Sequence, residues 1–250
     1  MARDRHQASG GPRVAGIEIA AGMVRAVVAR AEGGRVRVVG RGETALAADA
    51  IAGGLVVEPG TVTAAVGAAL AAAERGVPAE RTVIAIDGDD VRTYHVKTPF
   101  DREESGTPIV RAEADRAVRE AREEAVRVAQ TAVADDPALR GMATARLTDD
   151  VAALVLDGRE LDSIEGYHGR ALEVHTDVAV APLVLSGAAL ATVAPRRRPT
   201  AVPGIYALAR LVAASGIADA GVVRVGAAVT VMSTPRSRAR RPRQRRDPRR

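Results

Sequence analysis

The chain has 250 residues, enough for one large or two small domains, and 47% of them are hydrophobic, which suffices to build a core. It has no cysteine, which excludes disulfides, thiolate nucleophiles and cysteine metal sites. The formal charge is +5, but Pro235 to Arg250 hold nine of the 36 basic residues and one of the 31 acidic ones, which leaves 27 basic and 30 acidic residues elsewhere. The sequence therefore does not support nucleic-acid binding by the whole domain.

The first expected structure is a three-stranded meander. Residues 1–12 are expected to form a flexible arm, and because they lack the apolar segment of a signal peptide we expect a cytoplasmic protein. VAGIEIAAGMVRAVVA, Val14 to Ala29, predicts a buried strand, a tight turn and a second strand. Gly33 and Gly34 then predict a turn into a third strand, Arg35 to Gly40.

A helix and a buried strand follow. Thr61 to Arg75 predict a helix that Gly76 ends. The apolar residues that share one face of this helix are Val62, Val66, Ala69, Leu70 and Ala73. The short apolar run Thr82 to Ile86 predicts a strand of a buried parallel sheet.

The next segment predicts a strand, a helix and two more strands. The strands are Val91 to Thr98, Ala143 to Leu156 and Ala171 to Ala181, and the helix is Arg111 to Val133. In the helix, spacing predicts ion pairs of Asp115 with Arg119 and of Glu123 with Arg127. The link Asp157 to Arg170 is expected to be a polar loop. Such a unit can bury one sheet face under one helix.

The last part of the chain predicts further elements and a basic tail. Val178 to Pro195 is about long enough to span a membrane, but its Pro, Ser, Gly and Thr residues divide it into a strand end and a helix. Pro203 to Ser215 predict another helix, and Gly221 to Met232 predict one strand. The tail is rich in Pro and Arg, a composition that does not form a packed structure.

Single polar residues suggest no catalytic or metal site. His6, His95, His168 and His175 lie apart in the sequence, without acidic partners at metal spacing. The pairs Asp89-Asp90 and Asp149-Asp150 are interpreted as turn residues.

Three passages resemble FtsA, a family of actin-like cell-division proteins, and more distantly PilM, its pilus-assembly relative. VAGIEIAAGMVRAVVA is similar to the family opening (I/V)GxDIGTxxVxAxV, and its Val24 to Val27 to the VKAV of PilM. TVIAIDGDDVRTYHVKTPF, with the later helix IVRAEADRAVREAREEA, resembles the FtsA passage that leads into an inserted subdomain. The run from Leu156 to Val174 resembles the FtsA order of DG, a short link and GMxGxxLEV.

The resemblance, together with the element order, implies an α/β fold. We expect a partial actin-like subdomain of the ribonuclease H-like kind from residues 13–90 and 183–232. An inserted α+β strand-helix-strand-strand subdomain, residues 91–182, would interrupt it, and residues 233–250 would form a disordered Arg-rich tail.

The same resemblance implies a degenerate nucleotide site. Its remaining contacts would be Glu18, Gly22, Gly226 and Thr230, but Glu18, Ala20 and Ala21 stand where the family has DIGT. Arg224 takes the place of an acid in the second phosphate strand, where a cation opposes Mg²⁺ binding. We therefore expect no catalytic residue, no metal site and no cofactor, with ATP and Mg²⁺ binding as the alternative.

The function implied is that of a non-enzymatic FtsA-like scaffold in cell division or envelope assembly. Its partners would be other division or envelope-assembly proteins, contacted through Arg119, Glu123 and Arg127 of the long helix, and self-association is also possible. An ATPase of the PilM or FtsA kind is the first alternative.

The tail allows three other interpretations. It could bind anionic lipid and hold the protein at the inner face of the cell membrane, it could bind nucleic-acid phosphates without specificity, or it could be the product of a frameshift that truncates an FtsA-like protein. Seven arginines are expected to meet an anionic surface: Arg236, Arg238, Arg240, Arg241, Arg243, Arg245 and Arg246.

Overall fold

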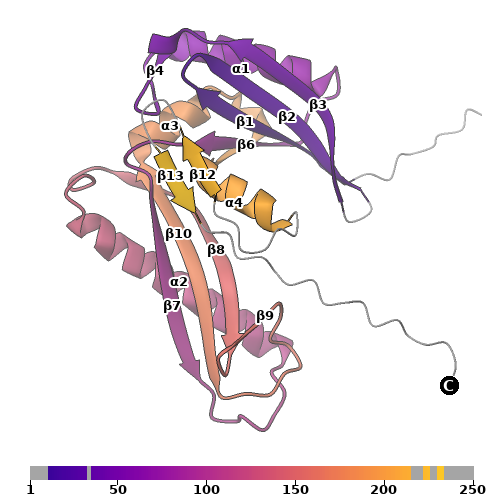
Figure 1. Cartoon of the computed structure of the whole chain (residues 1–250), viewed down its shortest axis with the longest axis vertical. Coiled ribbons are helices and arrows are strands. Elements are labelled where there is room, and N and C mark those ends of the chain that lie inside the picture. Colours follow the sequence, from indigo (N-terminus) through magenta and orange to yellow (C-terminus); the bar gives the residue numbers. More distant parts are fainter. Residues whose placement is uncertain (1–10, 33–34, 215–221, 226–229, 234–250) are drawn as a thin grey trace, which may run out of the picture.

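The computed structural model describes residues 11–32, 35–214, 222–225 and 230–233, which form two main sheets placed end to end along the long axis of the molecule (Figure 1). The described elements are, in chain order, β1 (Arg13–Ala20), β2 (Met23–Glu32), β3 (Arg35–Ala45), η1 (Ala48–Ala50), β4 (Ile51–Ala52), β5 (Leu55–Val56), α1 (Pro59–Glu74), β6 (Arg81–Ile86), β7 (Arg92–Asp101), α2 (Arg111–Asp135), β8 (Thr144–Leu156), β9 (Arg159–Leu161), β10 (Ala171–Pro182), α3 (Leu183–Ala191), η2 (Pro195–Arg197), β11 (Pro199–Pro203), α4 (Gly204–Ala214), β12 (Val222–Val225) and β13 (Thr230–Ser233).

The first sheet has the strand order β11-β6-β1-β2-β3. Strands β1, β2 and β3 form the predicted antiparallel meander, although its turn at Gly33 and Gly34 lies outside the described residues. Strand β6 runs parallel to β1, as the apolar run Thr82 to Ile86 predicted, and β11 runs parallel to β6. The carboxyl ends of β1, β6 and β11 therefore meet at one edge of this sheet.

Helix α1 packs directly on β2 and β3. Its predicted apolar face is buried, and two glycines let the backbones approach: a Cβ on Gly40 would lie 1.8 Å from the carbonyl oxygen of Ala73, and one on Gly42 would lie 2.1 Å from that of Ala69. The helix ends where Arg75 and Gly76 adopt left-handed conformations, with φ of 51° and 81°.

The second sheet has the order β7-β10-β8-β9, and α2 covers one of its faces. The buried side of α2 is made of alanines: Ala117, Ala121, Ala125 and Ala129. Small side chains at every fourth position let the helix lie close to β7 and β10. The predicted strand-helix-strand-strand order is thus present.

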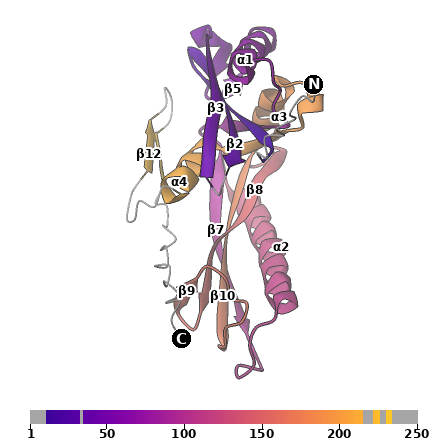
Figure 2. The same cartoon turned by 90° about the vertical axis from the view of Figure 1, so that its right-hand side faces the viewer.

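Strand β10 links the two sheets without a loop, since it ends at Pro182 and α3 begins at Leu183. Helices α1, α3 and α2 lie on one side of the sheets, and α4 lies on the other side (Figure 2). We call the side that carries α4 the front, because it faces the viewer in Figure 1. Among the described residues, no helix combines the length and the apolar character needed to cross a bilayer.

The structure corrects several expectations about elements. Residues 222–225 and 230–233 form two short antiparallel strands, β12 and β13, instead of one strand, because an apolar run does not distinguish one strand from two. The polar link after β8 contains β9, joined through Asp157 and Gly158 with φ of 47° and 77°. Asp149 and Asp150 lie within β8, not in a turn, whereas Asp89 and Asp90 do form a turn.

Candidate functional site

The carboxyl edge of the first sheet is where a ligand would be expected in an α/β fold. The turn after β1 contains Gly22, with φ of 86°, a conformation that strongly favours glycine. Asp87 and Gly88 follow β6, and Gly204 follows β11 as the first residue of α4. This edge therefore brings together the predicted site residue Gly22 and two segments that sequence reasoning did not assign to the site.

Glu18, the predicted acidic residue, is engaged by the protein itself. It lies directly opposite Arg25 in the β1–β2 register, and Arg25 Nη1 donates to Glu18 Oε2 at 3.0 Å. Arg25 Nε also lies 3.7 Å from Glu43 Oε1 on β3. The Arg25 guanidinium thus lies between two carboxylates and would compete with Mg²⁺ for the Glu18 oxygen that it binds.

Asp87 lies at the N-terminal end of α4. A Cβ on Gly204 would stand 2.5 Å from one carboxylate oxygen of Asp87, so any larger residue at this position would force the carboxylate to move. Because the first turn of a helix attracts negative charge, Asp87 stands where a phosphate would otherwise gain from the helix dipole.

The segment after β6 is enclosed on other sides as well. A Cβ on Gly54, in the turn between β4 and β5, would lie 2.0 Å from the backbone oxygen of Asp87, and one on Gly88 would lie 2.8 Å from a methyl carbon of Leu185 in α3. Sequence reasoning interpreted this region only as a turn, since its neighbours come from distant parts of the chain.

The second half of the predicted nucleotide site cannot be built from the described residues. Gly226 lies outside them. Thr230 begins β13, and Arg224 pairs through the backbone with Val231 in the β12–β13 hairpin. The tail arginines predicted to bind an anionic surface, from Arg236 to Arg246, also lie outside the described residues.

The predicted partner-binding residues Arg119, Glu123 and Arg127 share the exposed side of α2, opposite its alanines. Both predicted ion pairs, Asp115–Arg119 and Glu123–Arg127, are wrong. Arg127 instead binds Glu124, with an N–O distance of 2.6 Å, and Asp115 pairs with Arg111. Arg119 also borders a cavity of about 780 Å³ between α2 and the end of β7.

Arg102 fixes one wall of that cavity. Its buried guanidinium donates to Glu113 at 2.6 Å and to the backbone oxygens of Gly169 and Thr107. The hydrogen bond from Arg102 lowers the pKa of the Glu113 carboxyl. These bonds hold the loop after β7 and the link before β10 against the first turn of α2.

The front face of the second sheet carries a polar network that sequence spacing did not reveal. His95 Nδ1 lies 2.7 Å from Asp177 Oδ1, and His175 Nε2 lies 3.1 Å from Glu173 Oε2. The two histidine rings pack edge to face at 5.3 Å. The His95–Asp177 contact joins residues 82 positions apart across the β7–β10 pair, so sequence spacing could not show it, whereas His175 and Glu173 lie two positions apart on β10. Within the described ranges, however, no three His, Asp or Glu side chains gather as a metal site.

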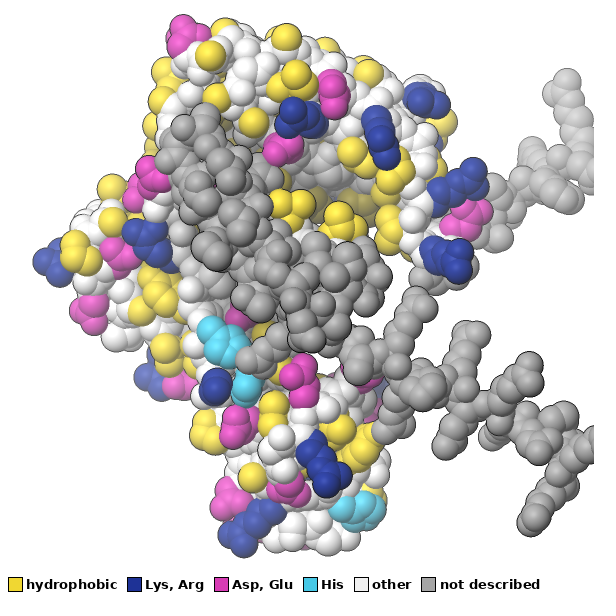
Figure 3. All heavy atoms as spheres, viewed as in Figure 1, with side chains coloured by type: hydrophobic (Ala, Val, Ile, Leu, Met, Phe, Trp, Pro, Cys, Tyr) yellow, Lys and Arg dark blue, Asp and Glu magenta, His cyan; other side chains and the backbone are white. Residues whose placement is uncertain are grey.

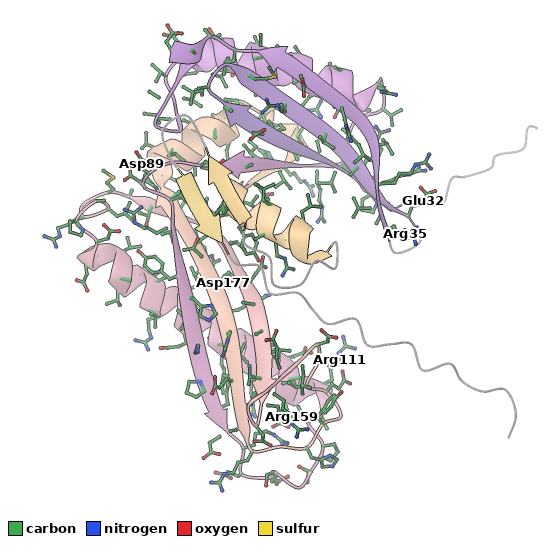
Figure 4. All side chains as sticks on the ribbon, in the orientation of Figure 1. Glu32, Arg35, Asp89, Arg111, Arg159 and Asp177 are labelled. Atoms are coloured by element: carbon green, nitrogen blue, oxygen red, sulfur yellow. The ribbon has the colours of Figure 1, made fainter. Side chains whose placement is uncertain are left out.

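Tyr206 connects this network to the first sheet. Its hydroxyl on α4 donates to Asp150 of β8. Burial raises the pKa of Tyr206, and so does the hydrogen bond to Asp150. Asp177, labelled in Figure 4, lies directly opposite Asp150 in the β8–β10 register.

Comparison with known proteins identifies the fold. No protein-family model matches the sequence, and no curated protein matches it. Among solved structures, a chain described as "PilM-PilN type IV pilus biogenesis complex" matches with a TM-score of 0.51 and 19% identity over 89% of this chain. The match spans 58% of that longer chain. The protein therefore has a mixed α/β fold similar to that of the matched chain.

Proposed function

We propose that the protein is a non-catalytic scaffold of the PilM and FtsA kind, acting in envelope assembly or cell division. The observation that carries this proposal is at the carboxyl edge of the first sheet, where both acidic groups are engaged within the chain. Glu18 binds Arg25, and Asp87 packs against Gly204 at the start of α4. Phosphoryl transfer depends on groups free to position Mg²⁺ and phosphate, and these two carboxylates are not.

The fold likeness supports a role in assembly. The matched structure is a complex of PilM with PilN, so a protein of this fold does hold a protein partner. In our chain, the exposed side of α2 with Arg119, Glu123 and Arg127 is proposed to contact other assembly proteins. The unit of residues 91–182 would then present this helix, while residues 13–90 and 183–232 form the actin-like unit.

Titration calorimetry with Mg-ATP tests the proposal directly. We expect no heat of binding at micromolar protein, for the unmodified chain and for Arg25→Ala, which removes the arginine partner of Glu18 but leaves Asp87 against α4. Submicromolar binding by the unmodified chain would contradict the non-catalytic role. It would favour the alternative, an actin-like ATPase, which the retained turn at Gly22 supports.

A second experiment separates the two assembly roles. Depleting the gene and measuring both cell length and surface pili distinguishes division from pilus assembly. Filamentous cells with normal pili would support the FtsA-like role, and loss of pili at normal cell length would support the PilM-like role. Unchanged cells on both measurements would contradict an assembly function.

A further inference from the structure

The front face of the first sheet, opposite α1 and α3, is lined by small apolar side chains. The strand register arranges them in rows: Val14, Ala29 and Val38 form one row, and Gly16 and Val27 form the next. We call the whole set the apolar trough, and its members are Val14, Gly16, Val27, Ala29, Ala31, Val36 and Val38. Glu32 of β2 and Arg35 of β3, labelled in Figure 4, form the last residue pair of these two strands. They lie next to Ala31 and Val36 of the apolar trough.

The described chain leaves the apolar trough open. Val27, Val38 and Val36 are 36%, 45% and 78% exposed, and a Cβ added to Gly16 would meet no atom within 4 Å. Figure 3 shows this side of the molecule, where hydrophobic side chains are exposed on the upper sheet among scattered charged ones. Contiguous exposed apolar surface of this kind marks an interaction site.

The front face of the second sheet differs in character. It carries the polar side chains of His95, Lys97, Glu173 and Asp177, which can hydrogen-bond with water. Both sheets have helices packed on the side away from this front (Figure 2). The difference in polarity is therefore between the two front faces. The exposed apolar side chains are therefore a feature of the first sheet and not of the second. Burying them would require another segment or protein to pack on this face.

The trough has the width of one α-helix. Helix α4 already packs on β6 and β11 at this front face. Neighbouring strands are about 4.8 Å apart, so β2 lies roughly 10 Å from β6, which is the usual spacing between packed helices. A helix centred on β2 would thus lie beside α4 and cover the trough from β1 to β3.

The charges around the trough indicate what kind of helix fits. Arg41 on β3 lies opposite Val27 and Arg81 on β6 lies opposite Val14, and neither has an ion pair with a described residue, whereas the Glu18–Arg25–Glu43 ion pairs fill the next row of the same face. Acidic side chains on both flanks of the incoming helix would satisfy Arg41 and Arg81.

We propose that the apolar trough binds an amphipathic helix of a partner protein, with an Ala, Val and Leu stripe and acidic residues on both flanks. This surface is distinct from the exposed side of α2 and from the sheet edge at Gly22. The proposal therefore holds whether or not the protein binds nucleotide.

The test uses two synthetic 18-residue helical peptides that share a Leu–Ala stripe. One carries glutamates on both flanks and the other carries lysines. Fluorescence anisotropy with the full chain is expected to show at least about tenfold tighter binding of the glutamate peptide, and the difference should shrink in 0.5 M salt. Equal affinity of the two peptides would overturn the proposal.

Two variants and a matched control locate the binding. Val38→Asp should weaken binding about tenfold or more, since it places a charge in the trough, whereas Val57→Asp, at 48% exposure outside it, should change nothing. Gly16→Phe should abolish binding by filling the trough and should leave the thermal midpoint equal or higher, because the added side chain has open space. Unchanged affinity in both trough variants would contradict the assignment.

Other occupants would give different results. If the chain alone sediments as a dimer that Gly16→Phe dissociates, the cover is a second copy and the proposal is wrong. If the amides of β2 and β3 exchange slowly in the chain alone, and Gly16→Phe accelerates that exchange, the trough is covered from within the same chain, and the proposal fails as well.

Discussion

Glu74 is a charged side chain inside the first core, only 6% exposed, at the C-terminal end of α1. Arg197 donates to both of its carboxylate oxygens, with Nη2 at 3.0 Å from Oε2, and the Ala79 N–H donates at 2.9 Å. Burial raises the pKa of the Glu74 carboxyl, but these hydrogen bonds outweigh it, so the pKa lies below its ordinary value. The pair fastens the segment before β11 to the end of α1.

Replacing Glu74 with glutamine should lower the free energy of unfolding at pH 7 by about 1–3 kcal/mol, because a charge-assisted bond between the buried carboxylate and the half-buried Arg197 is lost. The carboxylate stabilises the fold fully above its ordinary pKa of 4.5, and this contribution is lost as the pH falls through the lower folded-state pKa. Urea unfolding from pH 7 to pH 3 should therefore show the two proteins converging at the acid end. A constant difference across this range would contradict the assignment.

Gly204→Ala tests whether the Asp87 carboxylate occupies the start of α4. The new Cβ would stand 2.5 Å from that carboxylate, so the variant should lose about 1–3 kcal/mol of stability. Gly67→Ala in α1 is the matched control: its Cβ meets nothing within 4 Å, and higher helix propensity should stabilise it by up to about 1 kcal/mol. Thermal unfolding measures both, and a neutral Gly204→Ala would show that Asp87 does not hold this position.

At the scale of elements, the alanine side of α2 sets how closely the helix approaches its sheet. Ala121 is fully buried, so Ala121→Leu should overpack the contact and cost about 1–3 kcal/mol. Ala134→Leu, at an exposed position of the same helix, should be neutral. Chemical denaturation compares the two variants, and similar effects would mean that the helix can move away from the sheet at little cost.

Elements with a strong local pattern could be predicted from the sequence, and those that depend on distant partners could not. Glycines and alternating apolar residues revealed the β1–β2–β3 meander, and the regular apolar spacing revealed α1. Strand β11 was missed because Pro199 and Pro203 bound it, which is tolerated only because it lies at the sheet edge.

The candidate site was less predictable because its contacts are long-range. Arg25 opposite Glu18 follows from a hairpin register and could have been inferred. The contact of Asp87, just after β6, with Gly204, the first residue of α4, joins distant parts of the chain, and no local spacing signals it. Likewise, Arg197 reaches Glu74 across 123 residues, and only the folded arrangement reveals that pair.

At the scale of the whole molecule, Tyr206 ties α4 to the second sheet. Tyr206→Phe removes the donor to Asp150 and should cost about 1–2 kcal/mol. Tyr94→Phe is the control, because the buried Tyr94 hydroxyl has no hydrogen-bond partner among the described residues. Hydrogen exchange of β8 amides should accelerate only in Tyr206→Phe, and equal exchange in both variants would show that the bond does not couple the two sheets.

Strand β10 has a mechanical consequence. Leu172 and Val174 belong to one hydrophobic cluster, Val178 and Val180 to a second, and Ala181 to the core of the first sheet. A pull between the ends of the molecule would load this strand in shear along its length, so many backbone hydrogen bonds to β7 and β8 would have to break together. Because β10 pairs with β7 on one side and with β8 on the other, two ladders would share that load.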